Sequence, residues 1–119
     1  MQPEIFVRNY LRQHIPDVPT VFKMPASMPP RLLRIDPAPP RQLSLVTASA
    51  AVIVQAYGPD DDTAHEVLRT AWRALEDLEM QPEVLGWQVG NLPHFFPDPD
   101  RPTIARWQMV GNIIYNCAP

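Results

Sequence analysis

"VIVQAYGPDDDTAHEVLRTAWRAL", residues 52–75, places a strand pattern and a helix pattern on either side of a Gly-Pro break. Before the break, three β-branched residues in succession favour a buried strand over residues 48–57, while the alanine-rich start of that segment leaves a helix as the alternative. After the break, apolar residues recur at helical spacing. They are Ala64, Val67, Leu68, Ala71, Leu75 and Leu78. This stripe predicts an amphipathic helix that covers one face of a sheet.

The acidic residues after the Gly-Pro break are well placed to start this helix. Asp62 or Thr63 can cap its first turn, and Glu66 completes a Thr-x-x-Glu capping box with Thr63. The helix dipole also favours negative charge in this turn. Helix capping therefore explains the run Asp60 to Asp62 better than a calcium or magnesium cluster, because the alternating ligands and distal glutamate of a calcium loop are absent.

The segments before residue 48 predict one helix and two short strands. Ile5, Phe6, Tyr10 and Leu11 recur at helical spacing, and the helix cannot continue past Ile15 because a proline follows. Residues 20–24 and 31–35 are short and apolar-rich, with a proline-rich loop between them. They are predicted to form a pair of strands.

Residues 84–92 and 103–116 alternate between apolar and polar side chains and predict two more strands. Leu85, Trp87 and Val89 are expected on one face of the first, and Gly111 leaves a gap in the apolar face of the second. The predicted order α-β-β-β-α-β-β over residues 1–119 indicates a single α+β domain. It would have one mixed or antiparallel sheet of about five strands with two helices on one face.

Composition excludes several classes of protein. The chain has 119 residues, is 45% hydrophobic and carries a formal net charge of −3 without a lysine or arginine block, which argues against sequence-specific nucleic-acid binding. The single cysteine, Cys117, cannot form an internal disulfide, and no basic-then-apolar leader opens the chain. The longest apolar run, residues 48–54, is shorter than the roughly 20 residues that span a bilayer. We expect a reducing compartment and no membrane.

No catalytic, cofactor-binding or metal-ligating pattern is present in the sequence. The three histidines lie on different predicted elements, and no cysteine stands at a metal-ligand spacing from them. Asp98 and Asp100 lie between prolines on a tip expected to be exposed, where nothing would raise the pKa of either carboxyl. The serines lack a glycine elbow, and the four glycines form no phosphate-binding loop. We therefore expect a protein that is not an enzyme and has no cofactor.

Two proline-rich loops carry apolar side chains instead. "KMPASMPPR", residues 23–31, contains Met24 and Met28, and "LPHFFPDPDRP", residues 92–102, contains Phe95 and Phe96. Apolar side chains at a stiff tip suit docking to a partner, because proline lowers the ordering cost of the contact. The alternative is that both phenylalanines fold back as a lid on the sheet edge.

The order of five segments resembles the small tail-terminator proteins of long-tailed bacteriophages, especially those of actinobacterial hosts. The segments are "EIFVRNYLRQHI" (4–15), "RLLRID" (31–36), residues 52–75 quoted above, "GWQVG" (86–90) and "PDPDRPTIARWQMV" (97–110). They cover nearly the whole chain, and the C-terminal "NCAP" (116–119) departs from the family pattern. The similarity lies in the order of the segments, since none of the motifs is chemically unique.

The resemblance implies a structural virion protein. Members of this family form a six-membered ring on the end of the tail tube, stop its polymerisation and present the surface that the head connector joins. The implied partners are further copies of the chain in a homohexamer, the major tail tube protein and the head-tail connector or neck proteins. DNA would pass through the ring lumen without sequence-specific binding. The implied location is the head-tail junction of the virion, after assembly in the host cytoplasm.

The resemblance assigns contacts to exposed loops rather than catalytic residues. We map them onto Met24, Met28, Phe95, Phe96, Asp98 and Asp100. Two other functions are compatible with the sequence. One is a head-tail connector or neck ring protein, and the other is a non-viral protein-binding module that uses the Phe95-Phe96 loop.

Overall fold

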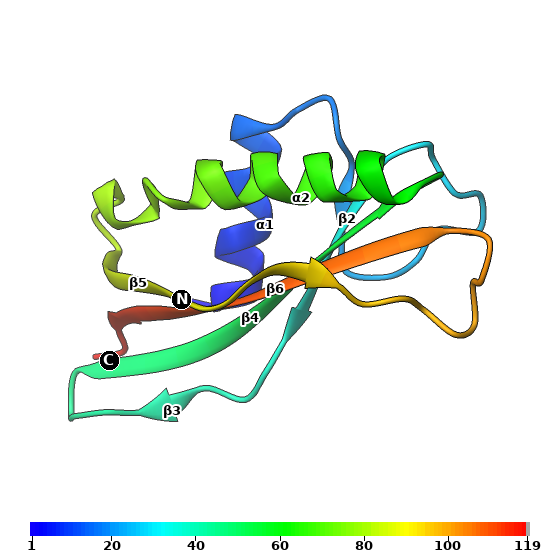
Figure 1. Ribbon diagram of the computed structural model, residues 1–119. Coiled ribbons are helices and arrows are strands. Elements are labelled where there is room, and N and C mark those ends of the chain that lie inside the picture. The colour runs from blue at the N-terminus through cyan, green and yellow to red at the C-terminus, as the bar shows by residue number, and fades with distance from the viewer. Residues whose placement is uncertain (119) are drawn as a thin grey trace.

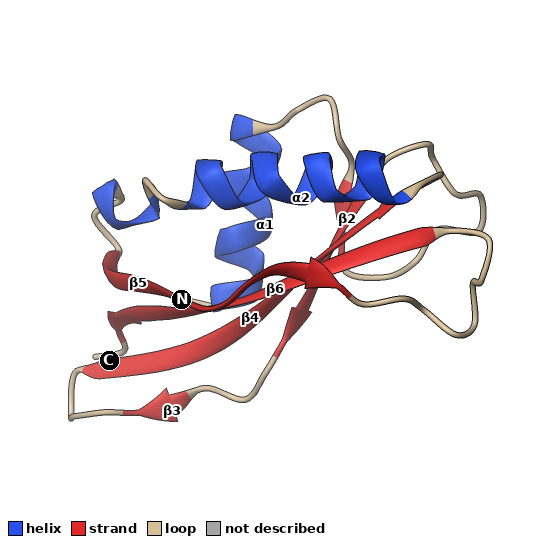
Figure 2. Cartoon of the chain, in the orientation of Figure 1, coloured by secondary structure: helices blue, strands red, loops and turns tan. Residues whose placement is uncertain are grey.

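The computed structural model describes residues 1–118 and consists of one mixed sheet with both helices on the same face (Figures 1 and 2). In chain order the elements are α1 (Pro3–His14), β1 (Thr20–Val21), β2 (Leu32–Pro37), β3 (Arg41–Gln42), β4 (Thr47–Gly58), α2 (Asp61–Leu75), the 3-10 turn η1 (Leu78–Met80), β5 (Val84–Phe95) and β6 (Ala105–Asn116). The strand order is β1-β2-β4-β6-β5, and β3 also pairs with β4. The predicted α+β class is confirmed, with six strands in place of about five.

The antiparallel ladder between β4 and β6 sets the long axis of the molecule. Each strand has twelve residues, and the ladder pairs Thr47 with Asn116 at one end and Gly58 with Ala105 at the other. A strand of this length spans about 35–40 Å at roughly 3.3 Å per residue. The molecule measures 46 Å along its longest axis. Features at the two ends of this ladder therefore lie far apart.

The core lies between this ladder and the helices. Alternate residues of β4 face the helices, and the apolar stripe of α2 packs on β4, β6 and β5. The β4 residues in the core are Ala48, Ala50, Val52, Val54 and Ala56. Helix α1 packs on β2 and α2, and the Tyr10 hydroxyl donates a hydrogen bond of 2.6 Å to the Ala74 carbonyl. The pattern on α1 differs from the prediction, because Val7 is fully buried while Ile5 and Phe6 are half-buried.

Two local predictions were wrong. Helix α2 is capped by Asp60, whose carboxylate accepts a 2.8 Å hydrogen bond from the Thr63 N–H, and not by Asp62 or Thr63. In β5, a register shift between Val84 and Gly86 inserts one extra residue, so that Leu85 is exposed and Val84 is buried. Such a bulge reverses the alternation of faces, which a period of two cannot anticipate.

Gly111 of β6 makes room for the indole ring of Trp87, as the predicted gap suggested. A Cβ atom added at Gly111 would stand less than 3.0 Å from three ring carbons of Trp87. Trp87 is buried there against the core. The ring fills the space that a side chain at position 111 would need, which fixes β5 on the ladder.

Candidate functional site

The aromatic loop, defined here as residues 95–104, joins β5 to β6 at one end of the sheet (Figure 1). Phe95 is 53% exposed and Phe96 is 43% exposed. The Phe95 ring meets Trp107 edge-on at 6.1 Å between centroids, and the Phe96 ring meets His94 edge-on at 5.9 Å. Both rings are about half exposed and each contacts an aromatic side chain of the same chain, so neither is fully buried in the core.

Arg106 of β6 holds the aromatic loop in place. Its guanidinium donates hydrogen bonds to the carbonyls of Phe96 (2.7 Å) and Pro97 (3.2 Å). The guanidinium carbon also lies 4.9 Å from the centroid of the Phe96 ring. The Phe96 N–H in turn donates to the Arg106 carbonyl at 3.1 Å. One side chain on a central strand thus fixes both the backbone and the ring of Phe96.

Asp98 is buried, which corrects the expectation that it lies on an exposed tip. Only 6% of the residue is exposed. Its carboxylate accepts hydrogen bonds from the Asp100 N–H (3.0 Å) and from Arg101 Nη1 (3.2 Å), and it lies 3.7 Å from Arg106 Nη1. The Asp98 side chain therefore binds groups of its own loop. A substitution of Asp98 would affect binding to a partner only by changing the conformation of the loop.

The surroundings of Asp98 also decide its charge state. Burial by itself raises the pKa of a carboxyl, but here the hydrogen bonds from Asp100 and Arg101 and the charges of Arg106 and Arg101 outweigh it. The net effect is that the pKa of Asp98 lies below its usual value. The carboxylate remains ionised at neutral pH, and Asp100 is left exposed beside it.

The two predicted methionines are half-buried in the loop between β1 and β2. Met28 lines a recess together with Pro59 and with Thr103 and Ile104 of the aromatic loop. Met24 does not line this recess. The structure therefore brings Met28 to the same end of the sheet as Phe95 and Phe96.

A second exposed apolar surface was missed by sequence reasoning. The apolar turn, defined here as residues 43–46, joins β3 to β4 at the opposite end of the ladder. Leu45 is 87% exposed, and Leu43 and Val46 are also exposed. The Ser44 hydroxyl oxygen accepts hydrogen bonds from the backbone N–H groups of Val46 and Thr47, which turns the apolar side chains outward. The sequence signal that could have indicated this surface was the alternation of Leu43 and Leu45 next to a proline-rich segment.

A groove lies next to this turn, on the face of the sheet away from the helices. It has a volume of about 440 Å³. It is lined by Pro39, Arg41, Leu43, Ser49, Ala51, Gln88, Asn112 and Ile114. The β4 and β6 residues among these alternate with those that face the core, so the groove belongs to the open face.

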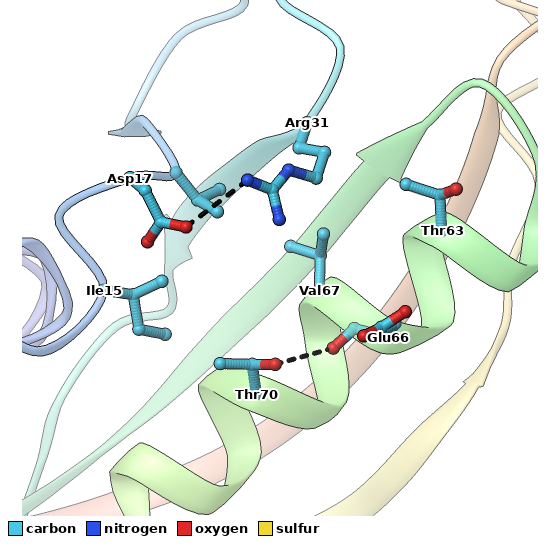
Figure 3. A pocket seen from close by; sticks show the side chains of 8 residues that line it. Ile15, Asp17, Arg31, Thr63, Glu66, Val67 and Thr70 are labelled. Atoms are coloured by element: carbon cyan, nitrogen blue, oxygen red, sulfur yellow. Dashed lines mark hydrogen bonds and ion pairs between the residues drawn. The ribbon is translucent and has the colours of Figure 1, made fainter.

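A smaller recess of about 180 Å³ lies between α2 and the segment that follows α1 (Figure 3). Ile15 and Val67 line it, and an ion pair of 3.4 Å between Asp17 and Arg31 crosses its side. The Thr70 hydroxyl nearby donates to the Glu66 carbonyl of its own helix at 3.0 Å. Both partners of the ion pair are largely exposed, so it contributes little to stability.

The histidines take part in aromatic contacts in three separate places. His14 stacks on Tyr10 at 4.0 Å, His65 stacks on Trp107 at 4.3 Å, and His94 lies beside Phe96. Within residues 1–118, no group of three histidine, cysteine or acidic side chains is arranged to hold a metal ion. Over the same residues, no helix is long and apolar enough to cross a membrane.

Together these features define a small α+β protein with exposed apolar surfaces at both ends of one long ladder. No protein-family model matches the chain, and no curated protein shows significant sequence similarity to it.

Proposed function

We propose that this protein is a bacteriophage tail terminator, which forms a ring on the end of the tail tube, stops tube polymerisation and provides the surface for head-tail joining. The order of its sequence segments resembles that family. The observation that carries the proposal is the presence of two different exposed apolar surfaces, the aromatic loop and the apolar turn, at opposite ends of the β4–β6 ladder. In this proposal the protein carries out no catalytic step.

Two different surfaces on one chain suit contacts between identical subunits in a ring. When one surface of a subunit binds a different surface of the next, the contacts are heterologous, and they close into a ring if the rotation between subunits permits it. A monomer would also be expected to cover apolar side chains such as Leu45 and Phe95, which here face outward. This arrangement supports self-assembly over a single-ligand binding module.

The edges of the sheet suit a protein that ends a polymer. Strand β5 forms one edge and carries three register irregularities, and Pro93 within it has no N–H to offer a neighbouring strand. At the other end of the strand order, β1 has only two residues. Neither edge presents a long, regular ladder to which a further subunit could add by strand pairing.

The net charge agrees with a ring through which DNA moves. A formal charge of −3 gives the chain no general attraction for phosphates, so DNA would slide through the lumen without being held. The proposed partners are further copies of this chain, the major tail tube protein and the head-tail connector proteins. The proposed location is the head-tail junction of the virion, with assembly in the host cytoplasm.

The proposal is tested in a parent phage that carries an early stop codon in this gene, with electron microscopy of the lysate. The expected result is headless tails of abnormal and variable length, because nothing caps the growing tube. Wild-type protein supplied from a plasmid should restore infectious particles with tails of uniform length. Tails of normal length beside unattached filled heads would contradict tube capping and would assign the protein to the connector side of the joint.

A further inference from the structure

We infer that the aromatic loop of one copy binds in the groove on the open face of a second copy. The inference rests on the proposed function, because it names the two surfaces by which the subunits of the ring would contact each other. It would give two exposed features of the chain, the aromatic loop and the groove, a common function.

The groove is lined by apolar and polar side chains, and its apolar members can receive an aromatic ring. Leu43, Ala51 and Ile114 line it, and no helix covers it, because both helices pack on the other face of the sheet. The amide side chains of Gln88 and Asn112 line the same groove. A volume of about 440 Å³ lies within the range of roughly 300–1,000 Å³ that is typical of binding pockets.

The loop and the groove are complementary in charge as well as in apolar character. Arg41 lines the groove and Asp100 lies in the same loop as the phenylalanines, and both residues are exposed. Among residues 1–118, neither side chain forms an ion pair. Each phenylalanine would therefore cover apolar surface in the groove while Asp100 of one copy pairs with Arg41 of the next.

A single chain cannot fill its own groove with its own loop. Gly58 pairs with Ala105 where the loop ends and β6 begins, whereas Ser49 pairs with Ile114 at the groove, nine residues away along β4. At roughly 3.3 Å per residue, this separation is about 30 Å. The contact must therefore join two copies, and since it uses different surfaces on each it repeats from subunit to subunit.

The loop is already ordered before it binds. Arg106 fixes the Phe96 carbonyl and ring, and the buried Asp98 carboxylate organises the following turn. Little conformational entropy is then lost when the loop enters the groove, which favours a stable contact.

The test uses two variants that each lose one half of the contact. The loop variant Phe95→Ser/Phe96→Ser keeps an intact groove, and the groove variant Arg41→Asp/Leu43→Asp keeps an intact loop. All four residues are exposed, so both variants should fold. The control Met80→Asp changes an apolar side chain that is 80% exposed and belongs to neither surface. Sedimentation velocity and native mass spectrometry report the size of each assembly.

We expect wild type and the Met80→Asp variant to assemble and each contact variant to remain monomeric by itself. An equimolar mixture of the two contact variants should form a 1:1 dimer that grows no further, because only one intact loop meets one intact groove. Reversing one charge, by Arg41→Asp or Asp100→Arg, should weaken self-association about tenfold, and combining both reversals in one chain should restore it.

The experiment distinguishes failure of the inferred contact from failure of the proposed ring. If wild type assembles but the mixture of variants stays monomeric, or if the groove variant still assembles, the inferred contact is wrong while the proposed ring stands. If wild type remains monomeric up to millimolar concentration, both the contact and a self-assembling ring are contradicted.

Discussion

Replacing Arg106 with lysine should loosen the aromatic loop while leaving the sheet folded. The arginine donates to the Phe96 and Pro97 carbonyls, contacts the Phe96 ring and lies 3.7 Å from the Asp98 carboxylate. Lysine keeps the positive charge but lacks the planar fork that reaches two carbonyls at once. The variant Arg106→Lys therefore isolates the geometry of these contacts from their charge.

The size of the effect follows from the contacts that lysine cannot replace. A hydrogen bond from a charged donor contributes about 1.5–3 kcal/mol, and lysine retains at most one of the two. Loss of the contact with the Phe96 ring adds about 0.5–1 kcal/mol. The free energy of opening the loop should fall by about 2–4 kcal/mol, which corresponds to an increase of about 30- to 900-fold in the open population.

Amide hydrogen exchange measured by NMR reports this opening residue by residue. The N–H groups of Asp100 and Arg101 donate to Asp98, and that of Phe96 donates to the Arg106 carbonyl of β6. All three should exchange faster by that factor. Amides of the central strand β4 should keep their protection, since β4 is paired on both sides. As a matched control, Arg101→Lys changes a more exposed arginine that makes one contact with Asp98, and exchange should rise by about fivefold or less.

The reasoning would be refuted if the loop amides kept their wild-type exchange rates in the Arg106→Lys variant. It would also be refuted if β4 and the loop lost protection together, because Arg106 would then support the sheet as a whole. Equal effects of Arg106→Lys and Arg101→Lys would show that the two carbonyl contacts of Arg106 add nothing beyond the contact that each arginine makes with Asp98.

Three further predictions concern stability. In urea titrations, Phe95→Ser/Phe96→Ser should lower the free energy of unfolding of the monomer by roughly 1–1.5 kcal/mol per ring, because each ring is about half exposed. A loss of 3–5 kcal/mol per ring would show instead that both are core residues. Gly111→Ala should cost about 1–3 kcal/mol through overlap with Trp87, and the cost should shrink in a Trp87→Leu background; an equal cost in both backgrounds would contradict the packing argument. The folded state lowers the pKa of Asp98, so its ionised carboxylate stabilises the protein at any pH above the usual carboxyl pKa near 3.8. This stabilisation is lost as the pH falls through the lower pKa of the folded state. The amide shift of Asp100 should therefore titrate below about pH 4 in wild type and not in Asp98→Asn, and a midpoint above pH 4 would reverse the sign.

The elements predicted well from sequence are those that local patterns determine. Helix α2 follows from an apolar stripe that keeps the helical period along most of its length. Strand β4 follows from the β-branched run Val52 to Val54. The gap at Gly111 could also be predicted from the sequence, because this glycine interrupts the otherwise apolar face of β6. Strand β3 could not be predicted, because its two residues form a strand only by pairing with Ala48 and Ser49 of β4.

The surroundings of Asp98 illustrate why the site was harder to predict than the fold. In the sequence, Asp98 stands between prolines in a polar segment, which is typical of an exposed tip. Its burial depends on Arg101 and on Arg106, which belongs to the next strand and points back over the loop. Neighbours that meet only after β5 and β6 pair leave no periodic signal, so composition suggested the opposite environment. The bulge at Leu85 misled the assignment of faces for the same reason.

The buried carboxylate and the exposed phenylalanines are parts of one arrangement. In the proposed contact, a loop that presents Phe95 and Phe96 to a second copy cannot use their side chains to hold itself in the core, so its order has to come from other groups. Asp98 and Arg106 supply that order with hydrogen bonds and charge, and Arg106 reaches Phe96 through both its carbonyl and its ring. If the loop were only a connection between two strands, the exposed rings would have no use for such support. The polar network under the loop is therefore the structural reason to regard the aromatic surface as a contact surface.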